Sequence, residues 1–116
     1  MKTKTAKDIL IKALGYIRKG WTQGYYAKSK SKRYVDADSR AAVCWCMVGA
    51  ICKAAGSCAP TTSCWSSQPQ TEACLFLKKV TGTECLVDFN DFRGRKKSEV
   101  IAAFKKAIKL ASAKEA

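Results

Sequence analysis

The sequence predicts a mainly α-helical protein with about four helices around one core and a small β-hairpin after the first helix. Three observations favour this fold class. Apolar residues recur at helical spacing in several stretches of the chain. Glycine follows each of the first three stretches, where a helix is expected to end. The 116 residues suffice for one core, and neither an internal repeat nor a second domain is visible.

The first helix is expected directly after a frayed basic tail, residues 1–4. Thr5 and Asp8 have the spacing of a capping box at its start, and Gly20 follows its last turn. The stripe that faces the core consists of Ile9, Leu10, Ala13, Leu14 and Ile17.

A β-hairpin is predicted next, because the helical pattern stops at Trp21. Tyr25–Tyr26 and Tyr34–Val35 are the expected strands, and Ser29–Arg33 is the exposed basic tip between them. The tip segment can equally be a solvated loop, since clusters of like charge are often simply hydrated.

A second helix is predicted from a cap at Asp38 or Ser39 to Gly56. Trp45 lies beside its apolar stripe, so we expect this side chain to reach the first helix or the turn around Trp21. Residues 57–70 are rich in Ser, Thr, Pro and Gln and are predicted to form a loop. The stripe itself consists of Val43, Met47, Ala50, Ile51 and Ala54.

Two more helices are predicted in the last part of the chain. The first begins at Gln68-Pro69 and ends at Gly82. Its inner face consists of Ala73, Phe76, Leu77 and Val80. Residues 85–92 are expected to be a short buried segment that enters an Asx-type turn. The last helix is predicted from Lys97 to about Ala113. Its stripe consists of Val100, Ile101, Phe104, Ala107, Ile108 and Ala111.

The chain carries 22 Lys and Arg residues against 9 Asp and Glu residues, a net charge of +13. A charge of about 2 to 8 suffices for solubility in a small domain, so this excess indicates an anionic partner. Nucleic acid, a nucleotide, an acidic protein face or an anionic membrane surface would fit the charge alone. No apolar run is long enough to span a membrane, and the N-terminal stretch lacks a signal-peptide cleavage site. We therefore expect a cytoplasmic protein without a membrane partner.

Most of the cysteines are interpreted as small buried thiols rather than as disulfides or metal ligands. An odd count without a secretion signal argues against a disulfide framework. The chain has no histidine and no CxxC pair, so we expect no metal and no cofactor. Cys58 and Cys64 flank a polar loop and could pair under oxidising conditions. The seven cysteines are Cys44, Cys46, Cys52, Cys58, Cys64, Cys74 and Cys85.

Catalysis has little support in the sequence, and we expect a binding protein rather than an enzyme. No histidine is available as a general base, and Gly20–Gly24 lacks the Lys-Ser/Thr of a phosphate-binding loop. Asp88 and Asp91, with Glu84 or Glu99, could hold a divalent metal for phosphodiester hydrolysis. Adjacent Asx residues are nevertheless ordinary turn chemistry, and we prefer that interpretation.

One stretch combines aromatic rings, cations and glycines, and we predict the ligand site there. It is GYIRKGWTQGYYAK, from Gly15 to Lys28. Such a composition suits an anionic ligand that carries a ring, although a turn whose aromatics close the core looks the same. Arginines also flank Gly94 ahead of the last helix, whose N-terminal amides favour an anion. The predicted site comprises Arg18, Trp21, Gln23, Tyr25, Tyr26, Arg93 and Arg95.

Three blocks of the sequence resemble a family of small uncharacterised proteins that phages and bacteria encode. The blocks are ALGYIRKGWTQGYYAK, CWCMVGAI and DFNDFRGRKKSEVIAAFKKAI, which together cover roughly two thirds of the chain. Phe89 stands where the family usually has Trp, and Lys96 stands where it has a capping Thr. The resemblance implies a mostly helical domain and a phage origin, with the host cytoplasm as its location. It implies no activity.

Two functions fit these observations. In the first, the protein sequesters an anionic nucleotide, such as a signal of a host immune pathway, with cations on the phosphate and Trp or Tyr stacked on the base. In the second, it binds nucleic acid, or inhibits a host defence protein by occupying its nucleic-acid channel. The cations of this second site would be Lys28, Lys30, Lys32 and Arg33.

The placement of the cations should separate the two functions. A nucleotide site gathers them in one concave pocket, which could lie at the interface of a homo-oligomer. A nucleic-acid binder spreads them over an open face. The compactness of the aromatic and basic stretch favours the nucleotide hypothesis.

Overall fold

The computed structural model describes residues 5–37, 39–55 and 69–115. Within these residues the chain forms five helices and one two-stranded antiparallel sheet. The elements are α1 (Ala6–Lys19), β1 (Ala27–Ser29), β2 (Ala42–Trp45), α2 (Met47–Ala55), α3 (Pro69–Thr81), α4 (Leu86–Asp91) and α5 (Lys97–Glu115). The predicted fold class, mainly helical with a small hairpin after the first helix, is confirmed. The predicted tail and most of the predicted loop, with Cys58 and Cys64, lie outside the described residues.

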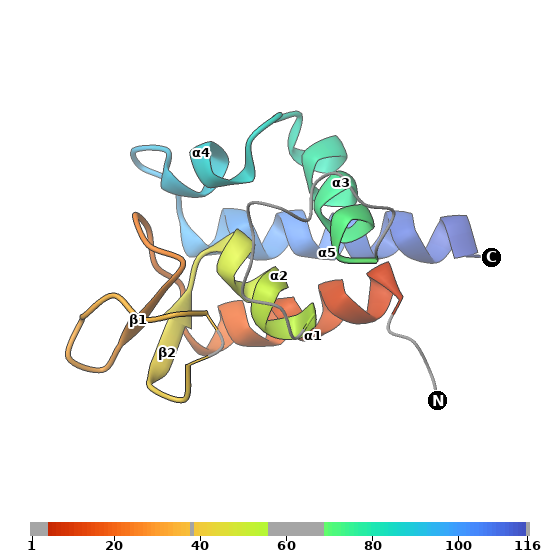
Figure 1. The fold of residues 1–116 in the computed structure, drawn as a ribbon. Coiled ribbons are helices and arrows are strands. Elements are labelled where there is room, and N and C mark those ends of the chain that lie inside the picture. Colours follow the sequence, from red (N-terminus) through yellow and green to blue (C-terminus); the bar gives the residue numbers. More distant parts are fainter. Residues whose placement is uncertain (1–4, 38, 56–68, 116) are drawn as a thin grey trace.

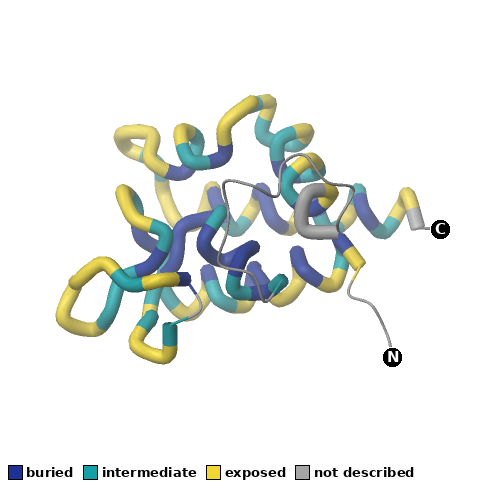
Figure 2. Tube along the Cα trace, in the orientation of Figure 1, coloured by how far each residue is buried: buried dark blue, intermediate teal, exposed yellow. Residues whose placement is uncertain are grey.

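The core lies where α1 meets α2, α3 and α5. In Figure 1, α1 and α5 lie side by side and run in opposite directions, and the sheet and α4 lie at the end where α1 finishes and α5 begins. Figure 2 shows the buried residues along the inward faces of these helices. Among the described helices, none combines the length and the apolar character needed to cross a bilayer. The largest fully buried apolar side chains include Leu10, Ile17, Met47, Ile51, Leu77 and Phe104.

The predicted ends of α1, α3 and α5 are confirmed. Thr5 and Asp8 form the capping box of α1, with the Asp8 amide 3.1 Å from the Thr5 hydroxyl. Helix α3 begins at Pro69, so the last two residues of the predicted loop are helical. At the start of α5, Lys96 has no capping hydroxyl, but its amide donates to the Glu99 carboxylate at 2.8 Å. Half of a capping box therefore remains despite the missing threonine.

The sheet differs from the predicted hairpin in its strands. Strand β1 pairs with β2, with Ala27 opposite Trp45, and not with a second strand at residues 34–35. Of the expected pairing with residues 34–35, one isolated β-bridge is present, between Lys28 and Tyr34 on the other side of β1. Tyr25–Tyr26, expected to be a strand, forms a bend ahead of β1.

The predicted start of the second helix is wrong, because residues 42–45 form β2 and α2 begins only at Met47. The backbone of this segment has partners on both sides, which is why tertiary pairing overrides its helical pattern. Trp45 pairs with Ala27 on one side and bridges Trp21 on the other. Its ring packs on Tyr16 with centroids 5.0 Å apart, so the expected contact with the first helix and the Trp21 turn is confirmed.

The segment expected to enter an Asx-type turn is instead the short helix α4. Asp88 is exposed on its outer side, whereas Asn90 is completely buried. The Asn90 side chain contacts residues more than 40 positions away in the sequence, so local turn chemistry does not explain it.

Two glycines allow backbones to approach closely around the sheet. A Cβ at Gly20 would collide with the Val43 carbonyl, and a Cβ at Gly49 would collide with the Tyr26 carbonyl. Gly20 is in extended conformation, so it is required for space and not for a left-handed turn. Gly49 places α2 directly against the backbone that leads into β1.

We expect Gly49→Ala to destabilise the fold by about 3 kcal/mol, because the added methyl group must displace the Tyr26 backbone. Urea unfolding of the purified variant measures this loss. Gly15→Ala is the matched control, since a Cβ there meets nothing within 4 Å. In the middle of α1 that change should stabilise the protein by roughly 0.5–1 kcal/mol. Equal stability of the two variants would contradict the packing described here.

Candidate functional site

The side-chain amide of Asn90 joins three segments that are distant in the sequence. Its Oδ1 accepts hydrogen bonds from Trp21 Nε1 at 2.7 Å and from the Met47 amide at 3.0 Å. Its Nδ2 donates to the Thr22 carbonyl at 3.0 Å. Asn90 has no exposed surface, so these bonds satisfy groups that water does not reach. The turn after α1, the start of α2 and the end of α4 are thereby fixed to one another.

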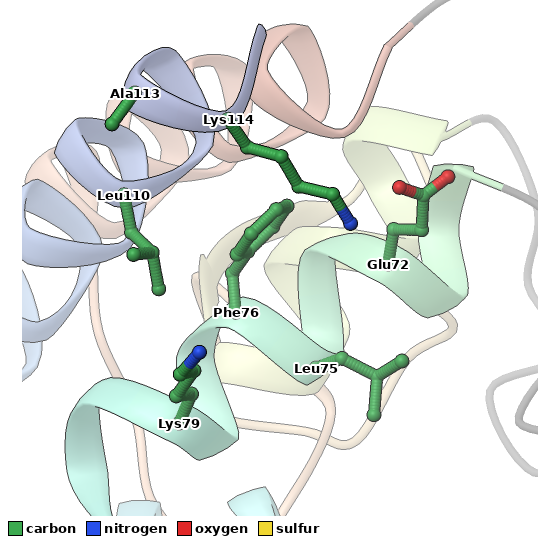
Figure 3. A pocket seen from close by; sticks show the side chains of 7 residues that line it. All are labelled: Glu72, Leu75, Phe76, Lys79, Leu110, Ala113 and Lys114. Carbon is green, nitrogen blue, oxygen red and sulfur yellow. The ribbon is translucent and has the colours of Figure 1, made fainter.

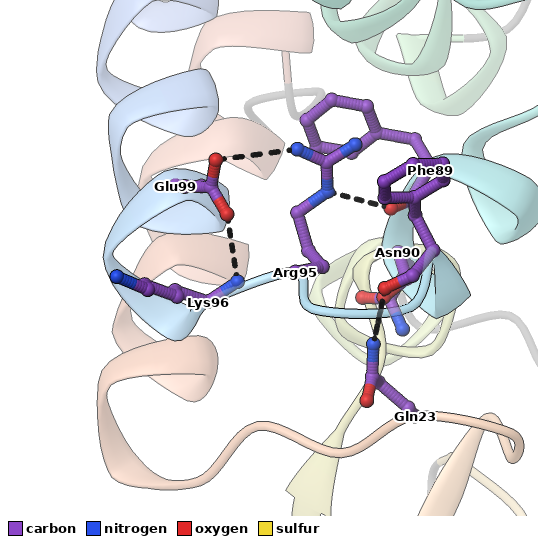
Figure 4. A network of polar contacts seen from close by, with 7 residues as sticks. Gln23, Phe89, Asn90, Arg95, Lys96 and Glu99 are labelled. Atoms are coloured by element: carbon purple, nitrogen blue, oxygen red, sulfur yellow. Dashed lines mark hydrogen bonds and ion pairs between the residues drawn. The ribbon is translucent and has the colours of Figure 1, made fainter.

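A second set of contacts fixes the same turn to the residues around the end of α4. Gln23 Nε2 donates to the carbonyls of Asn90 and Phe92, at 2.9 and 3.1 Å. Figure 4 shows the Gln23 amide directed at the Asn90 backbone. From the other side, Asp91 Oδ1 accepts a hydrogen bond from the Gly24 amide at 2.9 Å. Two of the seven residues predicted to bind a ligand, Trp21 and Gln23, therefore use their polar groups within the fold.

The arginines of the predicted site differ in how far they are engaged within the protein. Arg95 is half-buried, with its guanidinium carbon 3.7 Å from the centroid of the Phe89 ring. The Arg95 side chain also donates to the Phe89 carbonyl and pairs with Glu99 at 3.4 Å (Figure 4). Arg18 and Arg93 are exposed. The segments of Trp21 and Arg95 are adjacent, because Gln23 and Arg95 both contact residues at the end of α4.

Three tyrosines line a cavity of about 220 Å³ beside the sheet. Tyr25 and Tyr26 belong to the predicted site, whereas Tyr34 comes from the far side of the basic segment. The remaining lining residues are Gly24, Cys46, Val87 and Asp91. The cavity thus has mainly aromatic and apolar walls and one carboxylate.

The exposed rings of Tyr25 and Tyr34 and the half-buried Lys28 form one group, which we call the tyrosine face. The rings of Tyr25 and Tyr34 lie 5.8 Å apart at 39°, and Lys28 Nζ lies 4.7 Å from the centroid of Tyr25. Tyr25 is 49% exposed, and Tyr34 is 55% exposed. Two large rings held next to each other and to a cation, and left in contact with solvent, are available to a ligand.

The segment between Lys28 and Tyr34 carries three more cations, Lys30, Lys32 and Arg33, which we call the basic tip. All three are exposed, and none forms an ion pair with a residue that the structure describes. The loop is closed by hydrogen bonds from the Ser29 amide to the Arg33 carbonyl and from the Lys32 amide to the Ser29 carbonyl, each 2.9 Å long. The predicted basic tip is therefore a hydrogen-bonded loop beside the tyrosine face.

Burial controls the ionisation of two groups in the cavity wall. It raises the pKa of the Cys46 thiol to about 11, so the thiol is neutral at physiological pH. Burial also raises the pKa of the Tyr26 hydroxyl above its ordinary value. A neutral thiol is a poor nucleophile, so burial disfavours thiolate chemistry at Cys46.

A larger cavity, of about 530 Å³, lies between α3 and the end of α5 (Figure 3). Its walls are Leu75, Phe76, Leu110 and Ala113, and its charged lining residues are Glu72, Lys79 and Lys114. None of the predicted site residues lines it. The Lys114 ammonium lies 5.6 Å from the Phe76 ring centroid, so part of its charge is already engaged within the protein.

Sequence reasoning missed Tyr34 as a site residue and assigned Asp91 to a turn. The spacing of Tyr25 and Tyr34 around a basic segment was the available signal, since a hairpin brings such residues together. No signal existed for Asp91, which reaches the cavity only because the Asn90 contacts place α4 against the Gly24 turn. Among the described residues, no cluster of three or more Cys, Asp or Glu side chains could hold a metal ion. The expected absence of zinc stays a prediction, because Cys58 and Cys64 are not described.

We expect Asn90→Ala to destabilise the protein by more than about 3 kcal/mol. Truncation leaves the Trp21 indole, the Met47 amide and the Thr22 carbonyl without their partner, and each buried unsatisfied group costs about 1–3 kcal/mol. Chemical unfolding of the variant measures the change. Asp88→Ala, on the exposed side of the same helix, should change stability by less than about 0.5 kcal/mol. A similar effect of both substitutions would show that the Asn90 contacts are dispensable.

Comparison with known proteins identifies a family of unknown function. The model described as "Family of unknown function (DUF6197)" matches residues 1–110, which is nearly the whole chain. No curated protein matches, and no solved structure matches. The resemblance to an uncharacterised family is thus confirmed, while the phage origin stays a prediction. The chain belongs to the DUF6197 family.

Proposed function

We propose that the protein binds single-stranded nucleic acid through the tyrosine face and the basic tip. The observation that carries this proposal is the exposed pair of Tyr25 and Tyr34 rings with the Lys28 ammonium beside them. Proteins that bind single strands combine aromatic rings, on which bases stack, with cations that follow the phosphates. Both parts occur here within one continuous segment, residues 25–34.

The charge of the basic tip supports contact with a phosphate backbone. Lys30, Lys32 and Arg33 are exposed and lack an internal anionic partner among the described residues. They lie in the sequence between Lys28 and Tyr34 of the tyrosine face. A strand whose base stacks on Tyr25 could therefore place neighbouring phosphates over the tip. Such contacts release condensed counterions and make binding strongly dependent on salt.

The shape of the cavity favours a strand over an enclosed nucleotide. At about 220 Å³ it is smaller than the roughly 300–1,000 Å³ of typical small-molecule sites. Its lining includes the Asp91 carboxylate and no Lys or Arg, so a phosphate would be repelled from the interior. The cations lie outside the cavity, on an open surface, which is the arrangement expected of a nucleic-acid binder.

Sequestration of a free nucleotide and inhibition of a host defence protein stay predictions. Both would use the same cations, and neither has a specific structural observation in its favour beyond those given above. Arg18 and Arg93, predicted for the nucleotide site, are exposed but have no contact with the tyrosine face among the described interactions. Mononucleotides therefore serve as competitors in the experiment that follows.

Binding of a labelled single-stranded oligonucleotide should weaken steeply with salt, and Tyr25→Ala or Tyr34→Ala should weaken it further. Loss of one stacked base costs about 1–3 kcal/mol, which is roughly 5- to 150-fold in affinity. Four phosphate contacts predict a slope of log K against log salt of about −3. Fluorescence anisotropy at several salt concentrations measures both quantities. Tyr25→Phe keeps the stacking ring and should bind nearly as the unaltered protein does.

Two triple variants with equal charge control for the general positive field. Changing Lys30, Lys32 and Arg33 to Gln should reduce the salt slope by about 2, because three phosphate contacts are lost. The same change at Lys105, Lys106 and Lys109, exposed on α5, should leave the slope close to its original value. Equal losses in both variants would contradict the assigned site. Tight binding of a mononucleotide, with no binding of the oligonucleotide, would favour sequestration instead.

A further inference from the structure

We infer that the tyrosine cavity takes one base of the bound strand and that Asp91 makes it selective for guanine. This inference rests on the proposed binding of single-stranded nucleic acid. It follows from the carboxylate in the cavity wall, which stacking on tyrosines and contact with phosphates do not explain. Asp91 would then be the specificity-determining residue of the site.

The Asp91 carboxylate is held in a fixed orientation. Its Oδ1 accepts hydrogen bonds from the Gly24 amide and from Asn90 Nδ2, both at 2.9 Å. Its Oδ2 accepts none from any residue that the structure describes, and Asp91 forms no ion pair with one. In a protein with a net charge of +13, this carboxylate is therefore an oriented acceptor without a cation of its own.

The walls around that acceptor suit a flat ring system. Tyr25, Tyr26 and Tyr34 supply aromatic surfaces, and Val87 supplies an apolar one. A volume of about 220 Å³ accommodates a single base more readily than a whole nucleotide, since complete small-molecule sites begin at about 300 Å³. The sugar and phosphate would remain outside, next to Lys28 and the basic tip.

A carboxylate oxygen only accepts hydrogen bonds, so it distinguishes bases by their donors. Guanine carries two adjacent donors, N1–H and the N2 amino group, on one edge. Both can be directed at Asp91 Oδ2, which has two lone pairs. Adenine and cytosine offer one exocyclic amino group beside an acceptor, and uracil and thymine offer one N–H between two carbonyl oxygens. None of these other bases offers two adjacent donors on one edge, so each would contact Asp91 Oδ2 through at most one hydrogen bond.

The test compares uridine oligonucleotides that carry one central guanine, hypoxanthine, adenine or cytosine. Hypoxanthine lacks only the N2 amino group of guanine. We expect the guanine strand to bind roughly tenfold more tightly than the hypoxanthine strand, in line with the discrimination of a paired base contact. Equal affinity of the unaltered protein for these two strands would overturn the inference without requiring any protein variant.

Asp91→Asn tests the assigned residue. The new side chain keeps an oxygen that can accept from Gly24 and Asn90, but it presents an NH₂ donor in place of Oδ2. The preference for guanine over hypoxanthine should fall to about onefold, while the salt slope stays unchanged. Asp88→Asn, which removes the same charge from another exposed residue of α4 that does not line the cavity, should keep the preference.

The outcomes separate this inference from the proposed function. Strong binding without any guanine preference, or a preference that survives Asp91→Asn, would refute the role of Asp91 and leave single-strand binding intact. Absence of binding to every oligonucleotide would refute the proposed function itself. Melting temperatures of both variants show whether they fold. If Asp91→Asn does not fold, the comparison of guanine with hypoxanthine strands on the unaltered protein decides the question.

Discussion

The hydrogen bonds of the Asn90 side chain are the contacts on which the remaining arrangement depends. They tie the Trp21 turn, the start of α2 and the end of α4 together inside the protein, where water cannot replace them. The same amide donates to Asp91 Oδ1, so it also orients the carboxylate of the cavity wall. One buried residue thus positions the turn that leads to Tyr25 and the acceptor that faces the tyrosines.

Close backbone packing gives the tyrosine face a firm support. Gly49 lets α2 lie against the Tyr26 carbonyl, and the Cys46 amide donates to that carbonyl at 3.1 Å. Tyr34 is held on the other side by its bridge to Lys28. Because the rings extend from a hydrogen-bonded framework, less conformational freedom would be lost when a base stacks on them. The packing of the short sheet and the exposure of the neighbouring Tyr25 and Tyr34 rings are therefore both consistent with the proposed binding of a base.

Local signals in the sequence predicted α1, α3 and α5 well, and they predicted the sheet, the start of α2 and the short helix α4 poorly. The capping box of Thr5, the proline at the start of α3 and the stripe of α5 act within a few residues, so the pattern alone identifies them. Strand β2 depends on pairing with two other segments of the chain. The sequence around Val43, which fits a helical stripe, does not reveal this pairing. The site shows the same division. Tyr25 and the basic segment were visible in the sequence, whereas Asp91 joins them through its hydrogen bond with the Gly24 amide, 67 positions away in the chain.

Nuclear magnetic resonance of the protein titrated with a guanine-containing single strand tests the central claim most directly. We predict that the largest shifts occur at the ring signals of Tyr25 and Tyr34 and at the Gly24 amide, with smaller shifts along the basic tip. The amides of α5 around Lys105 and Lys109 should stay close to their original positions. Shifts concentrated on α1 and α5, with the tyrosine rings unaffected, would contradict the account.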